Sequence, residues 1–108
     1  FKIIHCDEFQ TEGTDKIAER IKKRVGDNPL YLSIDIDVLD PAFAPGTGTP
    51  EIAGMTTREM VNVLRGLSGL NLVSADVVEV SPAYDHAEVT SLAAATIVYE
   101  LTNLFAKT

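Results

Sequence analysis

The sequence predicts an α/β protein built on a parallel sheet that carries helices on its faces. Three short runs rich in strand-forming residues alternate with three segments whose apolar residues recur at helical spacing. The two later strand runs are almost continuously apolar, which is typical of strands covered on both faces. Strands that alternate with helices form parallel sheets, because each helix carries the chain back before the next strand begins.

The first part of the chain is expected to form a strand, a helix and a second strand. We expect a short strand over Phe1 to His5 and a helix over Thr14 to Val25, with its basic residues on the face opposite the apolar ones. Gly26 supplies the end of this helix. The next strand is expected over Leu30 to Asp37, where residues that favour extended backbone predominate.

The second part is expected to form a long loop, a helix, a strand and a final helix. The loop runs from Val38 to Met55 and contains three prolines and three glycines. Thr56 and Glu59 have the spacing of a capping box, so a helix should begin between them. A strand over Asn71 to Val80 and a helix over about Glu88 to Phe105 complete the order.

Composition narrows the class of protein. The chain has 108 residues, enough for one small domain, and its net charge of −7 argues against a nucleic-acid partner. No apolar run reaches the roughly 20 residues of a membrane-spanning helix, so no membrane partner is expected. Cys6 is the only cysteine, which excludes an internal disulfide, and we expect it and His5 to be structural.

Two aspartates stand at the end of the second expected strand, where ligands of parallel sheets bind. Side chains two residues apart along a strand point the same way, so Asp35 and Asp37 would project together. Neighbouring carboxylates repel, and a divalent cation that takes their oxygens as ligands removes that cost. The pair is thus a candidate for metal binding or acid–base chemistry. The alternative is that both aspartates cap the following turn, as Asp40 before Pro41 is expected to do.

A third carboxylate, Glu79, lies near the end of the next expected strand. A lone carboxylate in an apolar strand is costly unless it is paired, either with Arg58 or Lys107 or with a cationic ligand. The loop from Pro45 to Glu51 is rich in glycine and threonine but lacks the Gly-Lys-Ser/Thr ending of a phosphate loop. It is either a rigid turn or a wall that offers hydroxyl and backbone groups to a ligand.

No nucleophile and base can be assigned from the sequence. Ser33 and Ser81 lie in no Gly-x-Ser-x-Gly elbow, so a serine hydrolase is not indicated. His86, at the start of the last expected helix, is the only histidine after the aspartate pair. We expect a structural role for it and keep a role as a base as the alternative.

Two stretches closely resemble the ureohydrolases, the family of arginases and agmatinases. The first is SIDIDVLDPAFAPGTGTP from Ser33 to Pro50, and the second is DVVEVSPAYD from Asp76 to Asp85. The first is highly specific, because its aspartates, its prolines and the Gly-Thr-Gly-Thr-Pro loop all match in register. Within these stretches, PGTGTP and SPAYD look more like agmatinases than arginases. The similarity covers most of the chain from about Leu30 and is less specific before it.

The resemblance implies an arginase-like fold, a doubly wound parallel sheet with helices on both faces, and a cofactor of two manganese ions (Mn²⁺). Asp35 matches a carboxylate that bridges both ions, and Asp37 matches a ligand to one of them. Thr49 and Glu79 match positions near the guanidinium of the substrate, with Glu79 as its anionic partner. The implied reaction is hydrolysis of a guanidino compound, with agmatine giving putrescine and urea in polyamine metabolism.

The resemblance also implies that residues 1–108 hold only part of a site. The other metal ligands of the family lie in Gly-Gly-Asp-His and His-x-Asp-x-His-x-Asp blocks, which this sequence lacks. The proton-shuttling histidine of the family also lies upstream, so we expect no catalytic residue here beyond the metal ligands. We therefore expect residues 1–108 to be the C-terminal portion of a single domain that needs its N-terminal portion. Alone, this portion should be inactive and bind manganese weakly.

Two other functions remain open. The same chemistry could act on guanidinobutyrate or arginine, because the residues that contact the far end of the substrate are expected in other loops. A noncatalytic binding or assembly module that keeps the fold is the alternative from a different class. The resemblance further implies a homo-oligomer. We expect a cytoplasmic location, although a mitochondrial or other targeting peptide would lie upstream of these residues.

Overall fold

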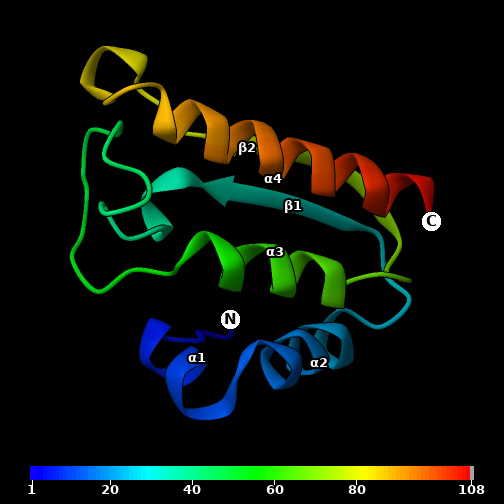
Figure 1. The fold of residues 1–108 in the computed structure, drawn as a ribbon. Helices are drawn as coiled ribbons and strands as arrows, with labels where there is room; N and C mark the ends of the chain where they lie inside the picture. The colour runs from blue at the N-terminus through cyan, green and yellow to red at the C-terminus, as the bar shows by residue number, and fades with distance from the viewer. Residues whose placement is uncertain (108) are drawn as a thin grey trace.

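Two parallel strands and four α-helices make up residues 1–107, the part of the chain that a computed structural model describes (Figure 1). Two short 3₁₀ turns, Ile36–Val38 and Pro82–Tyr84, follow the two strands directly or closely. The elements in chain order are α1 Cys6–Glu12, α2 Thr14–Val25, β1 Leu30–Asp35, α3 Thr57–Gly66, β2 Leu72–Val78 and α4 Val89–Ala106.

The two strands pair in parallel, as the alternation of strands and helices predicted. Ser33 of β1 lies opposite Asp76 of β2, and Asp35 lies opposite Val78. The carboxyl ends of both strands therefore meet at one edge of the sheet. This is the edge at which ligands bind in parallel sheets.

Helices α3 and α4 cover one face of this sheet. Ile34 of β1 and Leu72 of β2 are buried in one core with residues of both helices, whereas Tyr31, Ser33 and Asp35 are exposed. Successive side chains of a strand alternate between the two faces, so the exposed residues lie on the face away from the core. Helices α1 and α2 lie on the far side of α3 from β1 (Figure 1). Within residues 1–107, the expected helical cover is thus present on one face.

The local signals for helix ends are confirmed. Thr56 and Glu59 form the predicted capping box, in which the Glu59 amide donates to Thr56 Oγ1 at 3.0 Å and the Thr56 amide donates to Glu59 Oε2 at 2.8 Å. Gly26 follows α2 directly, and its amide donates to the Lys22 carbonyl at 2.9 Å. These bonds satisfy backbone groups that a helix end would otherwise leave unpaired.

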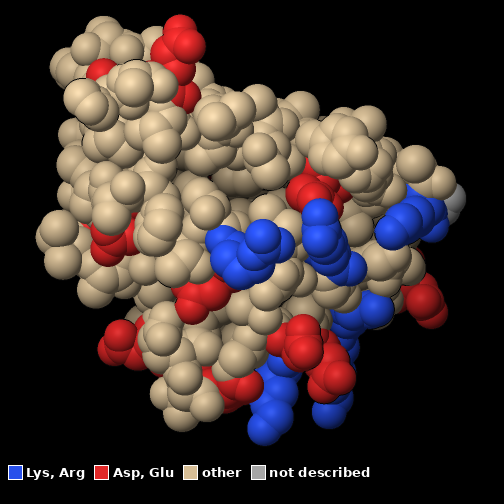
Figure 2. Space-filling view, in the orientation of Figure 1, with Lys and Arg blue, Asp and Glu red and all other residues tan. Residues whose placement is uncertain are grey.

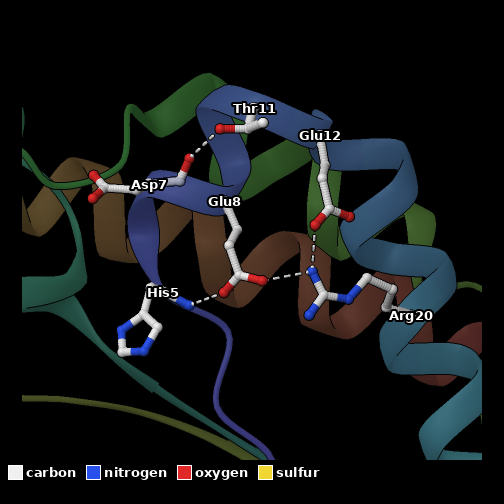
Figure 3. Close-up of polar contacts among 6 residues, drawn as sticks. All are labelled: His5, Asp7, Glu8, Thr11, Glu12 and Arg20. Carbon is white, nitrogen blue, oxygen red and sulfur yellow. Dashed lines mark hydrogen bonds and ion pairs between the residues drawn. The ribbon is translucent and has the colours of Figure 1, made fainter.

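The predicted strand over residues 1–5 is wrong, because this segment has no strand partner within residues 1–107. A strand is stable only when its backbone groups pair with a neighbour, and β1 and β2 pair with each other. Helix α1, which we did not predict, follows this segment. Arg20 of α2 holds it by donating to Glu8 at 2.9 Å and to Glu12 at 2.7 Å (Figure 3).

Helix α4 meets the length and composition of a membrane span, with 18 residues and a mean hydropathy of 1.3. This is weak evidence, because a helix that covers a sheet in a folded core meets the same criterion. Ile97, Leu101 and Leu104 of α4 are buried in the core, and its buried Glu100 pairs with Arg65 of α3. We therefore assign α4 to the cover of the sheet.

Candidate metal and substrate site

Asp35 and Asp37 lie at the carboxyl end of β1, but they do not share one strand. The expected strand through Asp37 is wrong, because β1 ends at Asp35 and a 3₁₀ turn begins at Ile36. Asp35 Oδ1 accepts a hydrogen bond from the Asp37 amide at 3.1 Å. This confirms, for Asp35, the alternative in which an aspartate caps the following turn. One oxygen suffices for that cap, and Asp35 Oδ2 has no hydrogen-bond partner within residues 1–107.

The loop after β1 brings Thr49 to this turn. Thr49 Oγ1 donates to Asp37 Oδ2 at 2.8 Å, so two of the predicted site residues are in direct contact. Asp37 is half-buried, and its Oδ1 makes no hydrogen bond to any of the residues that the structure describes. Each aspartate therefore presents one uncommitted oxygen at the edge of the sheet.

Asp40 closes the base of the loop from Val38 to Met55, and this contact is compatible with both predicted interpretations of residues 45–51. Asp40 accepts from the Ala42 amide at 2.9 Å and from the Ala53 amide at 3.1 Å, which closes the loop on itself and confirms the predicted aspartate turn. A side chain at Gly54 would come within 2.5 Å of the Asp40 backbone nitrogen, so only glycine fits there. A loop closed in this way holds Thr49 in place.

Glu79 follows β2 in a strained backbone conformation. Its φ of 67° lies in the left-handed region, which costs a residue with a side chain about 1–2 kcal/mol. The side chain is exposed and has no ion-pair partner in the described part of the chain, so neither Arg58 nor Lys107 pairs with it there. Arg58 instead lines a groove of about 430 Å³ between α3 and α4. Strain of this kind is often retained at functional sites.

Basic side chains are absent from the loops at this end of the sheet. No lysine or arginine occurs between Arg24 and Arg58 or between Arg65 and Lys107, so all four predicted site residues lie in segments without cations. Figure 2 shows the same separation, with blue side chains over the centre, right and bottom of this face and none over the loops at the left. An acidic edge without internal cations attracts positively charged ligands.

Asp76 is an acid that the sequence analysis did not single out. It lies in β2 and accepts hydrogen bonds from the hydroxyls of Ser33, at 2.6 Å, and Tyr31. These bonds lower the pKa of Asp76, and the bond to Asp76 raises the pKa of Tyr31. Asp76 therefore joins the exposed faces of the two strands. The sequence gives no signal for it, because the bonds depend on the register of the strands.

Gly46, Thr90 and Asp85 form a second group that the sequence analysis missed. The Gly46 amide donates to Thr90 Oγ1 at 2.8 Å, and Asp85 accepts from the amides of Thr90 and Ser91 at 3.0 Å each. Desolvation raises the pKa of Asp85, but hydrogen bonds from Thr90, Ser91 and His86 outweigh it and hold the pKa well below its usual value. An acid five residues before Thr90 does not match the usual capping spacing, so no local signal indicated this contact.

His86 and Cys6 take no part in the candidate site. His86 is exposed at the turn before α4, where its amide donates to Asp85 Oδ1 at 2.9 Å. Cys6 lies in α1, and its burial, followed by the charges of Glu59 and Asp7, raises the pKa of its thiol. A raised pKa disfavours the thiolate, which is the reactive form. The half-burial of Cys6 agrees with the structural role expected for it, whereas the His86 side chain makes no hydrogen bond to the residues that the structure describes.

The residues present fit part of a metal site. Carboxylate oxygens are suitable ligands for divalent cations, and Asp35 and Asp37 each have one oxygen uncommitted. No group of three or more His, Cys, Asp and Glu side chains in residues 1–107 is arranged to hold a metal ion. A closed site would therefore take further ligands from outside these residues.

The sequence profile of the arginase family matches residues 1–103. This chain belongs to the arginase family. It is 62% identical over 108 residues to putative agmatinase 1 of Schizosaccharomyces pombe, covering 100% of this chain and 27% of that protein. It is 54% identical over 101 residues to the agmatinase of Photorhabdus laumondii, covering 94% of this chain and 33% of that protein.

Solved structures of the family superpose closely on the chain. A hypothetical agmatinase from Burkholderia thailandensis matches 97% of this chain with a TM-score of 0.95 and 46% identity. The proclavaminate amidino hydrolase of Streptomyces clavuligerus matches 98% with a TM-score of 0.96 and 46% identity. These matches confirm the arginase-like fold class, and the chain covers 33% and 35% of the two structures. The chain thus spans about a third of the length of its relatives.

Proposed function

We propose that this chain supplies part of the active site of a manganese-dependent amidinohydrolase that converts agmatine to putrescine and urea. The observation that carries the proposal is the set of uncommitted carboxylates at the ends of the two parallel strands. Asp35 and Asp37 follow or end β1, Glu79 follows β2, and none of them has an ion-pair partner within residues 1–107. All three acids therefore have carboxylate oxygens open to a ligand at the same end of the sheet.

Asp35 and Asp37 would hold the metal through their open oxygens. Their other oxygens accept from the Asp37 amide and from Thr49, and these two bonds orient both carboxylates before a cation binds. A pair of manganese ions, when bound, lowers the pKa of bound water and so supplies hydroxide near neutral pH. The second ion and its remaining ligands are expected from the resemblance alone.

Glu79 and Thr49 would bind the guanidinium group. Guanidinium is planar and positively charged, and a carboxylate holds it by two parallel hydrogen bonds. Thr49 Oγ1 donates a hydrogen bond to Asp37 Oδ2, which leaves its lone pairs available as acceptors for a guanidinium N–H. The lack of lysine and arginine in these loops means that no basic side chain of the chain competes with the substrate for Glu79.

Agmatine is the proposed substrate because the sequence relatives named above are agmatinases. The same chemistry on guanidinobutyrate or arginine is the alternative. The chain is equally identical in sequence to the hypothetical agmatinase and to the proclavaminate amidino hydrolase, so the substrate has to be determined by assay. We further propose a homo-oligomer and a cytoplasmic location. Nucleic-acid binding is not part of the proposal, because the net charge is −7.

The test is urea release by the complete protein encoded around this chain, purified with manganese. Agmatine, guanidinobutyrate and arginine are compared at equal concentrations. We expect the highest kcat/KM for agmatine and no turnover by residues 1–108 alone. Absence of urea from all three compounds, in protein that is folded and loaded with manganese, would favour a noncatalytic module instead.

A further inference from the structure

Gly46 is held on both of its backbone polar groups by segments distant in the chain. Its amide donates to Thr90 Oγ1 in the first turn of α4, and its carbonyl accepts from the Ser81 amide, each at 2.8 Å. Gly46 and Thr90 are both buried, so water does not compete for the first of these bonds. Gly46 also packs closely against Asp85. A Cβ added to the glycine would lie 2.8 Å from the Asp85 Cβ and Cγ.

This contact joins the two segments that carry the proposed guanidinium ligands. Gly46 precedes Thr49 by three residues in the closed loop, and Ser81 follows Glu79 by two residues. Glu79 is in the left-handed region, a conformation that persists only when its surroundings hold it in place. The bond between Ser81 and Gly46 is the backbone contact nearest to Glu79 that ties it to the Thr49 loop.

We propose that Thr90 is a positioning residue, which sets the placement of Thr49 relative to Glu79 by accepting a hydrogen bond from the Gly46 amide. Helix α4 is the rigid reference, since its core residues pack against β2 and α3. Asp85 fixes the first turn of α4 by accepting hydrogen bonds from the Thr90 and Ser91 amides. Thr90 has no hydrogen bond to either predicted metal ligand within residues 1–107, so it acts on the site through the Thr49 loop, which also contacts Asp37. The proposal rests on the proposed function.

The test compares Thr90→Val with Thr90→Ser in the complete protein. Valine keeps the shape but removes the acceptor, and serine keeps the hydroxyl. The matched control is Thr102→Val, because the Thr102 hydroxyl also lies on α4 but donates only to the Val98 carbonyl of its own helix. For Thr90→Val, assayed with saturating manganese, we expect KM for agmatine to rise about tenfold, since small displacements of binding groups weaken ligand binding strongly. Thr90→Ser should have a KM for agmatine close to that of the parent protein.

A KM for Thr90→Val equal to that of Thr102→Val would overturn the proposal, even if the variant melts at a lower temperature. Should Thr90→Val not fold, Gly46→Ala replaces it in the same assay, because the added Cβ would lie 2.8 Å from the Asp85 side chain and must displace either the loop or Asp85. A raised KM supports the proposal, and an unchanged one contradicts it.

Amide hydrogen exchange separates this inference from the proposed function. In Thr90→Val, the Gly46 and Ser81 amides should exchange faster than in the parent protein, whether or not the protein releases urea. If the parent protein has no activity but both amides exchange faster, the proposed function fails and the connection through Gly46 stands. Unchanged exchange at Ser81 would overturn the connection.

Discussion

Glu100 and the strand-end carboxylates are acids of the same chain in opposite situations. Glu100 is 6% exposed, and Arg65 donates to both of its oxygens, with the shortest bond at 2.7 Å. These bonds lower the pKa of Glu100 despite its burial. Asp35 and Glu79 are exposed instead, and Asp37 is half-buried with one oxygen free within residues 1–107.

The difference separates acids that stabilise the fold from acids that await a ligand. A buried charge must be paired, because an unpaired one costs several kcal/mol. Exposed acids carry no such requirement, yet Glu79 sits in a backbone conformation that costs about 1–2 kcal/mol. Glu88 shares this conformation and its exposure, so the feature that distinguishes Glu79 is its place just after β2, at the end of the sheet where Asp35 and Asp37 lie.

The largest expected effect is that of Glu79→Gln on catalysis. Loss of the charge should lower kcat/KM for agmatine about 10- to 100-fold, since hydrogen bonds to a charged group contribute about 1.5–3 kcal/mol. The melting temperature should stay the same, because Glu79 has no ion-pair partner in residues 1–107. Glu88→Gln is the matched control, since Glu88 is also exposed and has a φ of 61°. Equal activity of the two variants would remove Glu79 from the site.

Arg65→Met should show the opposite behaviour. It leaves Glu100 buried without its partner, so the free energy of unfolding should fall by about 1–3 kcal/mol. The KM of the folded protein should not change, because Arg65 and Glu100 line the groove between α3 and α4 and none of the strand-end carboxylates does. Denaturant unfolding of Arg65→Met and of the exposed control Arg58→Met measures the effect. A loss no larger than about 0.5 kcal/mol, as for an ordinary surface residue, would contradict the structural role.

The smallest expected effect concerns the pH dependence of stability through Asp85. The pKa of Asp85 is lower in the folded chain than the value of about 3.9 in an unfolded one. Its contribution is therefore fully present above about pH 4 and is lost as the pH falls through the folded value. Asp85→Asn keeps an acceptor at the start of α4 but cannot ionise.

Thermal unfolding of both proteins from pH 7 to about pH 2 tests this. At neutral pH, the parent should have a higher melting temperature than Asp85→Asn. The difference between the two melting temperatures should narrow steadily below about pH 4. A difference that is constant over the whole range would mean that the charge of Asp85 does not matter.

Local signals in the sequence predicted most of the fold. The helices over Thr14–Val25, Thr57–Gly66 and Val89–Ala106 follow from apolar periodicity, and the first two also follow from Gly26 and from the Thr56 capping box. The strand expected over residues 1–5 failed, since strand pairing depends on a neighbour that the local sequence does not name. Helix α1 was missed for a similar reason, because it is held by contacts with Arg20 on the next helix.

The sequence predicted that Asp35, Asp37 and Glu79 lie near the ends of the strands, but it did not predict their local geometry. The contact between Asp37 and Thr49 agrees with their common assignment to the site, although Asp37 lies in a turn and not in β1. The left-handed conformation of Glu79 and the bond between Gly46 and Thr90 had no sequence signal. The latter joins residues 44 positions apart, a separation that no spacing rule covers.

The claim on which the account depends is that the open oxygens of Asp35 and Asp37 hold divalent cations. Manganese content of the complete protein, purified with manganese and then freed of excess metal, tests it most directly when compared with that of Asp37→Asn. We expect about two ions per chain in the parent and about one in the folded variant, because Asp37 is expected to bind one of the two ions. Equal manganese content in the two proteins would contradict it.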